Sequence, residues 1–168
     1  MSLIEEIIFD LGRKQNDMKK RVPDIKKESK EVLAVSSKQG NKSTQIADLF
    51  LKRIDDEEIY IEIKTTKPNK GESKEAKRGM LKIISLRDKH VATFVGMAYN
   101  PYEPEDFKWP LPLNYLKSGE DLLVGEFFWN FLGGYGTYKE LLEVFDEIGE
   151  EIRNEINNKI KEISKLIK

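Results

Sequence analysis

The segment IYIEIKTT, which begins at Ile59, alternates aliphatic and polar side chains, and this alternation constrains the fold more than any other feature. Side chains two residues apart lie on the same face of a β-strand. The buried face is therefore predicted to hold Ile59, Ile61 and Ile63. Glu62 and Lys64 then share the opposite face, so the sequence predicts a half-buried strand that presents an acid and a base together.

The other segments predict a small mixed sheet with helices packed on its faces, which is an α/β fold. In chain order, the predicted elements are helices at 3–11 and 23–35, a loop at 36–43, a hairpin with strands at 44–53 and 59–66, a helix at 73–87 capped by Ser73, a strand at 90–100, a proline-rich excursion at 101–115, a short apolar helix at 121–132 and a long final helix from Thr137.

At 168 residues the chain has the length of one domain. We divide it into a helical N-terminal region (1–43), a region of hairpin, helix and strand (44–98), and the excursion with the C-terminal helices (99–168). The sequence has no cysteine and one histidine, which excludes disulfides, thiolate catalysis and Cys/His zinc sites. Any hydrolytic chemistry must therefore depend on carboxylates, lysines and a hard metal ion.

Positive charge is concentrated in one part of the chain, although the formal net charge is only −1. Residues 60–89 contain nine lysine and arginine residues against four acidic ones, while the last thirty residues lean acidic. A local excess of this kind is expected where a polyanion binds.

Asp48 is the acidic residue whose position most needs explaining, because it lies within the apolar run IADLFL. A buried aspartate is costly unless it has a partner such as a cation. If the hairpin closes through the turn at 54–58, Asp48 lies beside Glu62. Two carboxylates and the backbone carbonyl of Ile63 would then form an oxygen-rich site suited to Mg²⁺.

Lys64 completes a D-x13-E-x-K arrangement with Asp48 and Glu62. Beside a metal site, this lysine can contact the scissile phosphate and help to orient or deprotonate the attacking water. The pattern is that of PD-(D/E)xK nucleases, with Ala47 in the place of the proline. The alternative is an ordinary hairpin in which Glu62 and Lys64 form a solvent-facing pair, and this alternative leaves only Asp48 unexplained.

Three longer stretches, IEIKTTKPNKGE, MAYNPYEPEDFKWP and LLVGEFFWNFLGGYGTYKELLE, resemble type II restriction endonucleases of the TdeIII-like family over residues 46–145. The resemblance implies a restriction-endonuclease-like αβα core and Mg²⁺-dependent cleavage of duplex DNA at short palindromes of the GGNCC type. It also implies that Asp48 and Glu62 are metal ligands and that Lys64 is the catalytic lysine. Members of the family carry more chain upstream, so we expect a product shortened at its N-terminus.

Nucleases of this kind often take an additional acid from a helix ahead of the hairpin. Glu28 and Glu31 are the candidates here. The competing interpretation is that both are solvated residues on the surface of that helix.

The loop after the catalytic strand is expected to contact DNA phosphates through Lys67, Asn69 and Lys70. Lys74, Arg78 and Lys82 recur every four residues and predict a basic stripe on the next helix; a solvated helix face explains Lys82 equally well. Phosphate contacts position the duplex without reading its sequence. The candidates for base reading stay open and are Asn69, Arg78, Asn100 and Lys108.

The final helix carries an apolar stripe close to heptad spacing. The stripe can fold back on the sheet or pair across a two-fold axis, and a palindromic site favours a homodimer. No membrane span or signal peptide is seen, so we expect a cytoplasmic protein. Two other functions stay open, namely a repair or junction-resolving nuclease on the same fold and a non-catalytic DNA-binding remnant.

Overall fold

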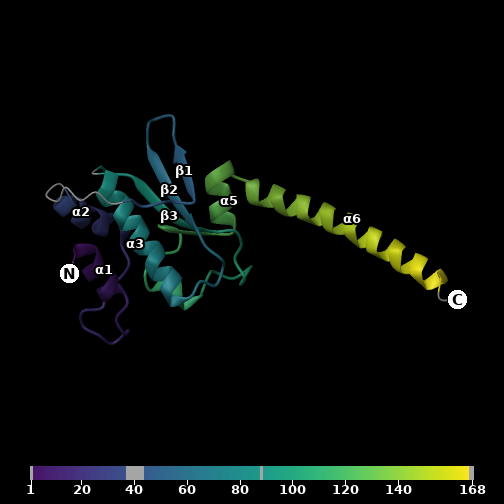
Figure 1. The fold of residues 1–168 in the computed structure, drawn as a ribbon, viewed down its shortest axis with the longest axis horizontal. Helices are drawn as coiled ribbons and strands as arrows, with labels where there is room; N and C mark the ends of the chain where they lie inside the picture. The colour runs from purple at the N-terminus through teal and green to yellow at the C-terminus, as the bar shows by residue number, and fades with distance from the viewer. Residues whose placement is uncertain (1, 37–43, 88, 167–168) are drawn as a thin grey trace. The chain divides into compact units, whose positions relative to one another are not determined.

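The computed structural model describes residues 2–36, 44–87 and 89–166, and the predicted loop at 37–43 lies outside these ranges. The chain forms two compact units, residues 1–128 and residues 129–168, which are described separately. The first unit contains the sheet (Figure 1). The prediction of one domain with three regions stays a prediction.

A four-stranded mixed sheet forms the centre of the first unit. Its strands are β1 (Leu49–Lys52), β2 (Glu58–Ile63), β3 (Ala92–Met97) and β4 (Leu122–Val124), in the spatial order β1-β2-β3-β4. β1 pairs with β2 in antiparallel fashion, and the other two pairings are parallel. The mixed sheet predicted from the sequence is confirmed. The prediction of one apolar helix over 121–132 is wrong in its first part, because residues 122–124 pair with β3.

Helix α3 (Lys70–Arg87) connects the parallel strands β2 and β3 and lies against the sheet (Figure 1). Asn69 begins it: its side chain accepts a bond from the amide of Glu72 (2.9 Å), and the Glu72 carboxylate accepts one from the amide of Asn69 (2.7 Å). This reciprocal pair is a capping box. The predicted cap, Ser73, is wrong, because Ser73 lies inside the first turn, where its buried hydroxyl donates to the Asn69 carbonyl.

Helices α1 (Leu3–Leu11) and α2 (Ile25–Ser36) both contact α3. α2 begins after Asp24, whose carboxylate accepts a bond from the amide of Lys27 (2.9 Å) and caps the first turn. Together these three helices bury the main apolar cluster against the sheet, so both predicted N-terminal helices are confirmed.

The opposite face of the sheet is covered at Gly96 by the ring of Phe128. Gly96 in β3 has no side chain, and a Cβ built there would lie 2.4 Å from the ring of Phe128. The same face buries Ile59 and Ile61, as the alternation predicts. Ile63 is instead 44% exposed, so the prediction that all three isoleucines are buried is wrong at the end of the strand.

Two further helices complete the described chain before its long final one, α4 (Pro110–Leu113) and α5 (Glu126–Gly133). In the second unit, Gly134 and Gly136 adopt positive φ angles of 95° and 94°, which favour glycine, and α6 (Thr137–Leu166) follows. The long C-terminal helix predicted from the sequence is confirmed. Within the described ranges, every helix is too short or too polar to cross a membrane.

Candidate functional site

Asp48 lies at a bend immediately before β1, and its side chain is exposed. The prediction of a buried aspartate is therefore wrong, because β1 is short and lies at the edge of the sheet. Its carboxylate nevertheless accepts a 2.7 Å bond from the backbone amide of Ile63. The antiparallel register pairs Leu49 with Ile61, and one further step places Asp48 opposite Glu62.

Glu62 and Lys64 lie together at the end of β2. The Lys64 ammonium donates to the Glu62 carboxylate over 2.6 Å, and each side chain is about one quarter exposed, at 24% and 27% respectively. The backbone amide of Lys64 donates to the carbonyl of Gly96 (2.9 Å), which joins this segment to β3. The acid–base pair is therefore held on the sheet and remains open to solvent.

The carbonyl of Ile63 points toward the edge strand. In a trans peptide the N–H and C=O groups point in opposite directions, and the Lys64 amide points at Gly96 on β3. The Ile63 carbonyl therefore faces the β1 side, where Asp48 lies. The structure thus brings the carboxylate of Asp48 and this carbonyl to one side of the segment from Glu62 to Lys64.

These groups fit a hard cation. One carboxylate oxygen of Asp48 accepts a hydrogen bond from the Ile63 amide, and one of Glu62 accepts a hydrogen bond from Lys64. The second oxygen of each carboxylate could therefore serve as a metal ligand. Mg²⁺ prefers oxygen ligands and retains several waters, so two carboxylates and one carbonyl suffice. Across residues 2–36, 44–87 and 89–166, no three acidic or histidine side chains gather as a metal-binding group.

The candidate additional acids lie in different surroundings. Glu28 on α2 is fully buried, with a carboxylate oxygen 2.5 Å from the ammonium of Lys77, which also donates to Asp121 over 2.7 Å. Burial raises the pKa of the Glu28 carboxyl, although the charge of Lys77 acts against this rise. The interpretation of Glu28 as solvated surface is wrong. Glu31 forms an ion pair with Arg21 at 2.7 Å and is partly exposed.

The buried partners of Glu28 were not predicted from the sequence. Lys77 lies on the apolar side of α3 with Ala76 and Met80. A buried lysine is costly unless a carboxylate pairs with it, so an acidic partner was to be expected. Asp121 directly precedes the buried strand β4. Both positions were therefore signalled by a charged residue within an apolar pattern.

The basic stripe on α3 faces another helix of the same chain. The guanidinium of Arg78 donates twice to the carboxylate of Glu5 on α1 (2.6 and 2.9 Å) and also contacts Glu75. The hydrogen bond from Arg78 is the largest effect that lowers the pKa of Glu5, and the charges of Lys74 and Lys82 add to it. The structure therefore places Arg78 in the α1–α3 contact.

The loop after β2 carries exposed basic side chains. Lys67 lies over the rings of Tyr102 (5.4 Å) and Trp109 (5.8 Å), and Lys70 is exposed at the first residue of α3. The indole of Trp109 donates to the carbonyl of Pro68 (3.0 Å), which fixes the loop. Asn69, between these residues, caps α3.

The other two candidates for base reading shape the proline-rich excursion. Asn100 donates to the carbonyl of Glu105 (2.7 Å) and accepts from the amide of Tyr102 (3.0 Å). Lys108 forms an ion pair with the Glu105 side chain. Their role in base reading stays a prediction.

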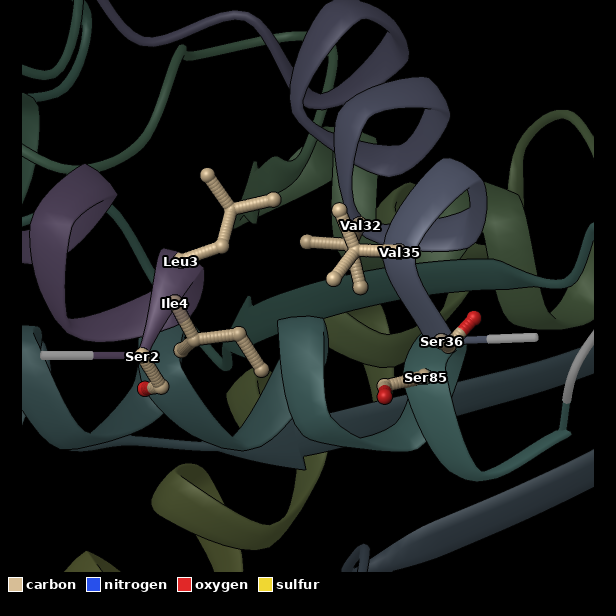
Figure 2. A pocket seen from close by; sticks show the side chains of 7 residues that line it. All are labelled: Ser2, Leu3, Ile4, Val32, Val35, Ser36 and Ser85. Carbon is tan, nitrogen blue, oxygen red and sulfur yellow. The ribbon is translucent and has the colours of Figure 1, made fainter. Parts of the chain in front are cut away.

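A small cavity of about 60 Å³ lies between α1, α2 and α3, and no acidic or basic side chain lines it. Figure 2 shows its lining, which consists of aliphatic side chains and serine hydroxyls without any titratable group. We do not regard this cavity as part of the functional site.

The mixed sheet, its flanking helices and the hairpin with an acid and an acid–base pair define an α/β fold of the restriction-endonuclease-like class. The chain belongs to the family of the type II restriction endonuclease HinfI, whose profile matches residues 1–149. The resemblance to type II restriction endonucleases is thus confirmed, whereas the TdeIII-like specificity stays a prediction.

Three curated relatives of the chain are also named type II restriction enzymes. The type II restriction enzyme HgiEI of Herpetosiphon aurantiacus is 34% identical over 108 residues, which cover 61% of this chain and 39% of that protein. HgiCII of the same organism is 33% identical over 108 residues, with 61% and 40% covered. MjaII of Methanocaldococcus jannaschii is 29% identical over 171 aligned positions, with 88% and 43% covered.

The chain therefore spans between 39% and 43% of the length of these relatives. No solved structure matches it.

Proposed function

We propose that this chain is a Mg²⁺-dependent endonuclease that hydrolyses phosphodiester bonds of duplex DNA at a short palindromic site of the GGNCC type. One observation supports the proposal above all: the 2.7 Å bond from the Ile63 amide to Asp48 joins this acid to the segment that carries Glu62 and Lys64. Membership of a restriction endonuclease family supports the same activity.

Asp48, Glu62 and the carbonyl of Ile63 would hold the Mg²⁺ ion. When bound, this ion would neutralise charge on the scissile phosphate. Lys64, 2.6 Å from Glu62, carries a positive charge to the same place and can donate to a phosphate oxygen or to the attacking water. Glu28 is left out of this set because its carboxylate is committed to buried Lys77.

The proposed substrate contacts are phosphate contacts from Lys67 and Lys70, which are exposed beside the catalytic strand. We leave Arg78 out of the contact set because Glu5 engages its guanidinium. Lys74, on the same side of α3 as Arg78, is proposed to add positive charge near the DNA without contacting a phosphate directly. A cytoplasmic location, where such an enzyme meets duplex DNA, is part of the proposal.

We also propose a homodimer formed through α6. Its apolar stripe is about half exposed at Ile148, Ile152, Ile156, Ile160 and Ile163, with exposed fractions of 44–55%. Residues 139–151 carry six acidic side chains and one basic one, whereas residues 153–165 carry four basic and two acidic ones. An antiparallel pair of α6 helices would bury the stripe and place opposite charges together.

Digestion of a plasmid in the presence of Mg²⁺ tests the proposed activity. Discrete fragments are expected, and they should disappear when the metal is chelated and return when Mg²⁺ is added. A continuous smear would indicate a nuclease without sequence specificity, such as a repair enzyme. Binding of duplex DNA without any cleavage would overturn the endonuclease assignment in favour of a binding module.

A further inference from the structure

The loop between α1 and α2 carries a second concentration of positive charge. Residues 13–21 include five basic side chains and one acidic residue, Asp17. The loop has a defined conformation, because Arg13 bridges Asp10 (2.6 Å) and Asp17 (2.9 Å), and the Asp17 amide donates to the Lys14 carbonyl (3.0 Å). Its cations are therefore presented by a structured segment.

This loop is fastened to the segment that follows α4. A Cβ at Gly12 would lie 2.8 Å from the hydroxyl oxygen of Tyr115, so only glycine permits this approach. The ammonium of Lys20 donates to the carbonyl of Leu11 and to the side chain of Asn114 (3.1 Å). The loop and the segment after α4 thus form one wall of a pocket.

The pocket has a volume of about 290 Å³ and opens beside the first residue of α3. Arg13, Lys14 and Gln15 line it from the loop, Asn114 lines it from the segment after α4, and Lys70 lines it from the start of α3. Its lining residues include three cations and no carboxylate. The pocket therefore offers hydrogen-bond donors and positive charge to an anion.

Part of that positive charge is not neutralised within the chain. Arg13 is balanced by Asp10 and Asp17. Among the described residues, no carboxylate lies within ion-pair distance of Lys14, Lys20 or Lys70. Burial lowers the pKa of Lys20, and the nearby charge of Lys70 lowers it further. An anion between these ammonium groups would relieve their mutual repulsion.

The pocket lies at the end of the loop that follows the candidate catalytic strand, because Lys70 lines it. Lys70 follows Lys64 by six residues, so the two Cα atoms are at most about 22 Å apart. The bond from Trp109 to Pro68 holds the connecting loop beside α4. One duplex bound at Lys64 can therefore reach the pocket, since phosphates along one strand of DNA recur about every 3.4 Å of the helix axis.

We propose that Lys14 and Lys70, with the charge of Lys20 close by, bind backbone phosphates of duplex DNA in this pocket, next to the site of cleavage. This inference rests on the proposed endonuclease function and extends it to the α1–α2 loop. The bound group is a phosphodiester held by charge, and this contact does not read the base sequence.

The test is the salt dependence of DNA binding by the full chain. A fluorescein-labelled 30-base-pair duplex is titrated without divalent metal, and the wild type is compared with Lys14→Gln, Lys70→Gln and the double variant. The double variant should bind about ten-fold or more weakly, with a log–log salt slope smaller in magnitude by about 2 because two phosphate contacts are lost. Lys30→Gln on α2, an exposed lysine outside the pocket, should match the wild type.

Both Lys14 and Lys70 are exposed, so neither variant should disturb folding, and a thermal melt confirms this for each. If the wild type binds and cleaves DNA while the double variant keeps its affinity and slope, the pocket assignment is overturned and the endonuclease proposal stands. If the variants lose binding of a free nucleoside triphosphate but not of the duplex, the ligand is a nucleotide and the assignment is overturned as well. A wild type that neither binds nor cleaves duplex DNA would overturn both.

Discussion

Lys77 on α3 donates a 2.7 Å bond to Asp121 at the start of β4, and both side chains are no more than 1% exposed. Glu28 on α2 lies 2.5 Å from the same ammonium group. One buried cluster of three charges therefore joins two helices and the sheet. A buried charge is stable only while its partners compensate it, so the cluster specifies how these elements pack.

Removing the central cation should destabilise the fold strongly. Lys77→Met leaves Glu28 and Asp121 buried without a counter-ion, and we expect a loss of about 3–5 kcal/mol in the free energy of unfolding, measured by urea denaturation. Lys82→Met on the same helix, where the side chain is partly exposed, should cost far less. Adding Glu28→Gln and Asp121→Asn to Lys77→Met should recover part of the loss; no recovery would contradict the electrostatic explanation.

The candidate active site makes a separate prediction. Glu62→Gln and Asp48→Asn keep the shape of each side chain but remove its charge, so cleavage should fall by at least about 100-fold, the scale for loss of one preorganised electrostatic group. Affinity for duplex DNA should persist, because neither residue is a cation. The measurement is the rate of plasmid cleavage with Mg²⁺, and the control is Glu57→Gln at the exposed turn of the same hairpin. Full activity in either variant would remove that residue from the metal site.

Local periodicity accounts for the parts of this site that the sequence predicted. The contact between Glu62 and Lys64 follows from the two-residue repeat of a strand, which needs no knowledge of the rest of the fold. The exposure of Asp48 could not be predicted in this way. It depends on β1 being a four-residue strand at the edge of the sheet, and an edge is a property of the whole topology.

The basic stripe on α3 shows the same limit. Helical spacing correctly places Lys74, Arg78 and Lys82 on one side of the helix, but it does not say what that side faces. Arg78 lies 73 residues from its partner Glu5 in the sequence, and such a pairing arises only when α1 packs on α3. A single sequence therefore predicted the presence of the charges and not their partners.

Glu58 predicts how stability depends on pH. Hydrogen bonds from Arg87, and then from Lys89 and Tyr60, lower the pKa of its carboxyl from 4.5 to about 2. A carboxyl with a lowered pKa stabilises the fold above its unfolded-state value, and this contribution is lost as the pH falls through the folded-state value. The Glu58 contribution should therefore be complete above about pH 4.5 and disappear toward pH 2.

Urea denaturation at several pH values between 6 and 2.5 checks this expectation. Glu58→Gln should be less stable than the wild type at pH 6, and the difference between the two should shrink as the pH falls. Glu57→Gln changes the neighbouring exposed acid and should leave the pH dependence close to that of the wild type. A constant difference between Glu58→Gln and the wild type across this range would show that the ion pairs do not control the effect.

The apolar stripe on α6 leads to a prediction about dimer formation. Ile152 and Ile156 lie at its centre and are 52% and 53% exposed, so a partner helix would remove apolar surface from water at both positions. The double variant Ile152→Gln, Ile156→Gln should sediment as a monomer at concentrations where the wild type is a dimer. Lys161→Gln, an exposed position on the side of α6 away from the stripe, should leave the dimer in place. Raising the salt concentration should weaken the dimer if acidic and basic halves meet. A wild type that sediments as a monomer at every concentration would exclude α6 as an interface between copies.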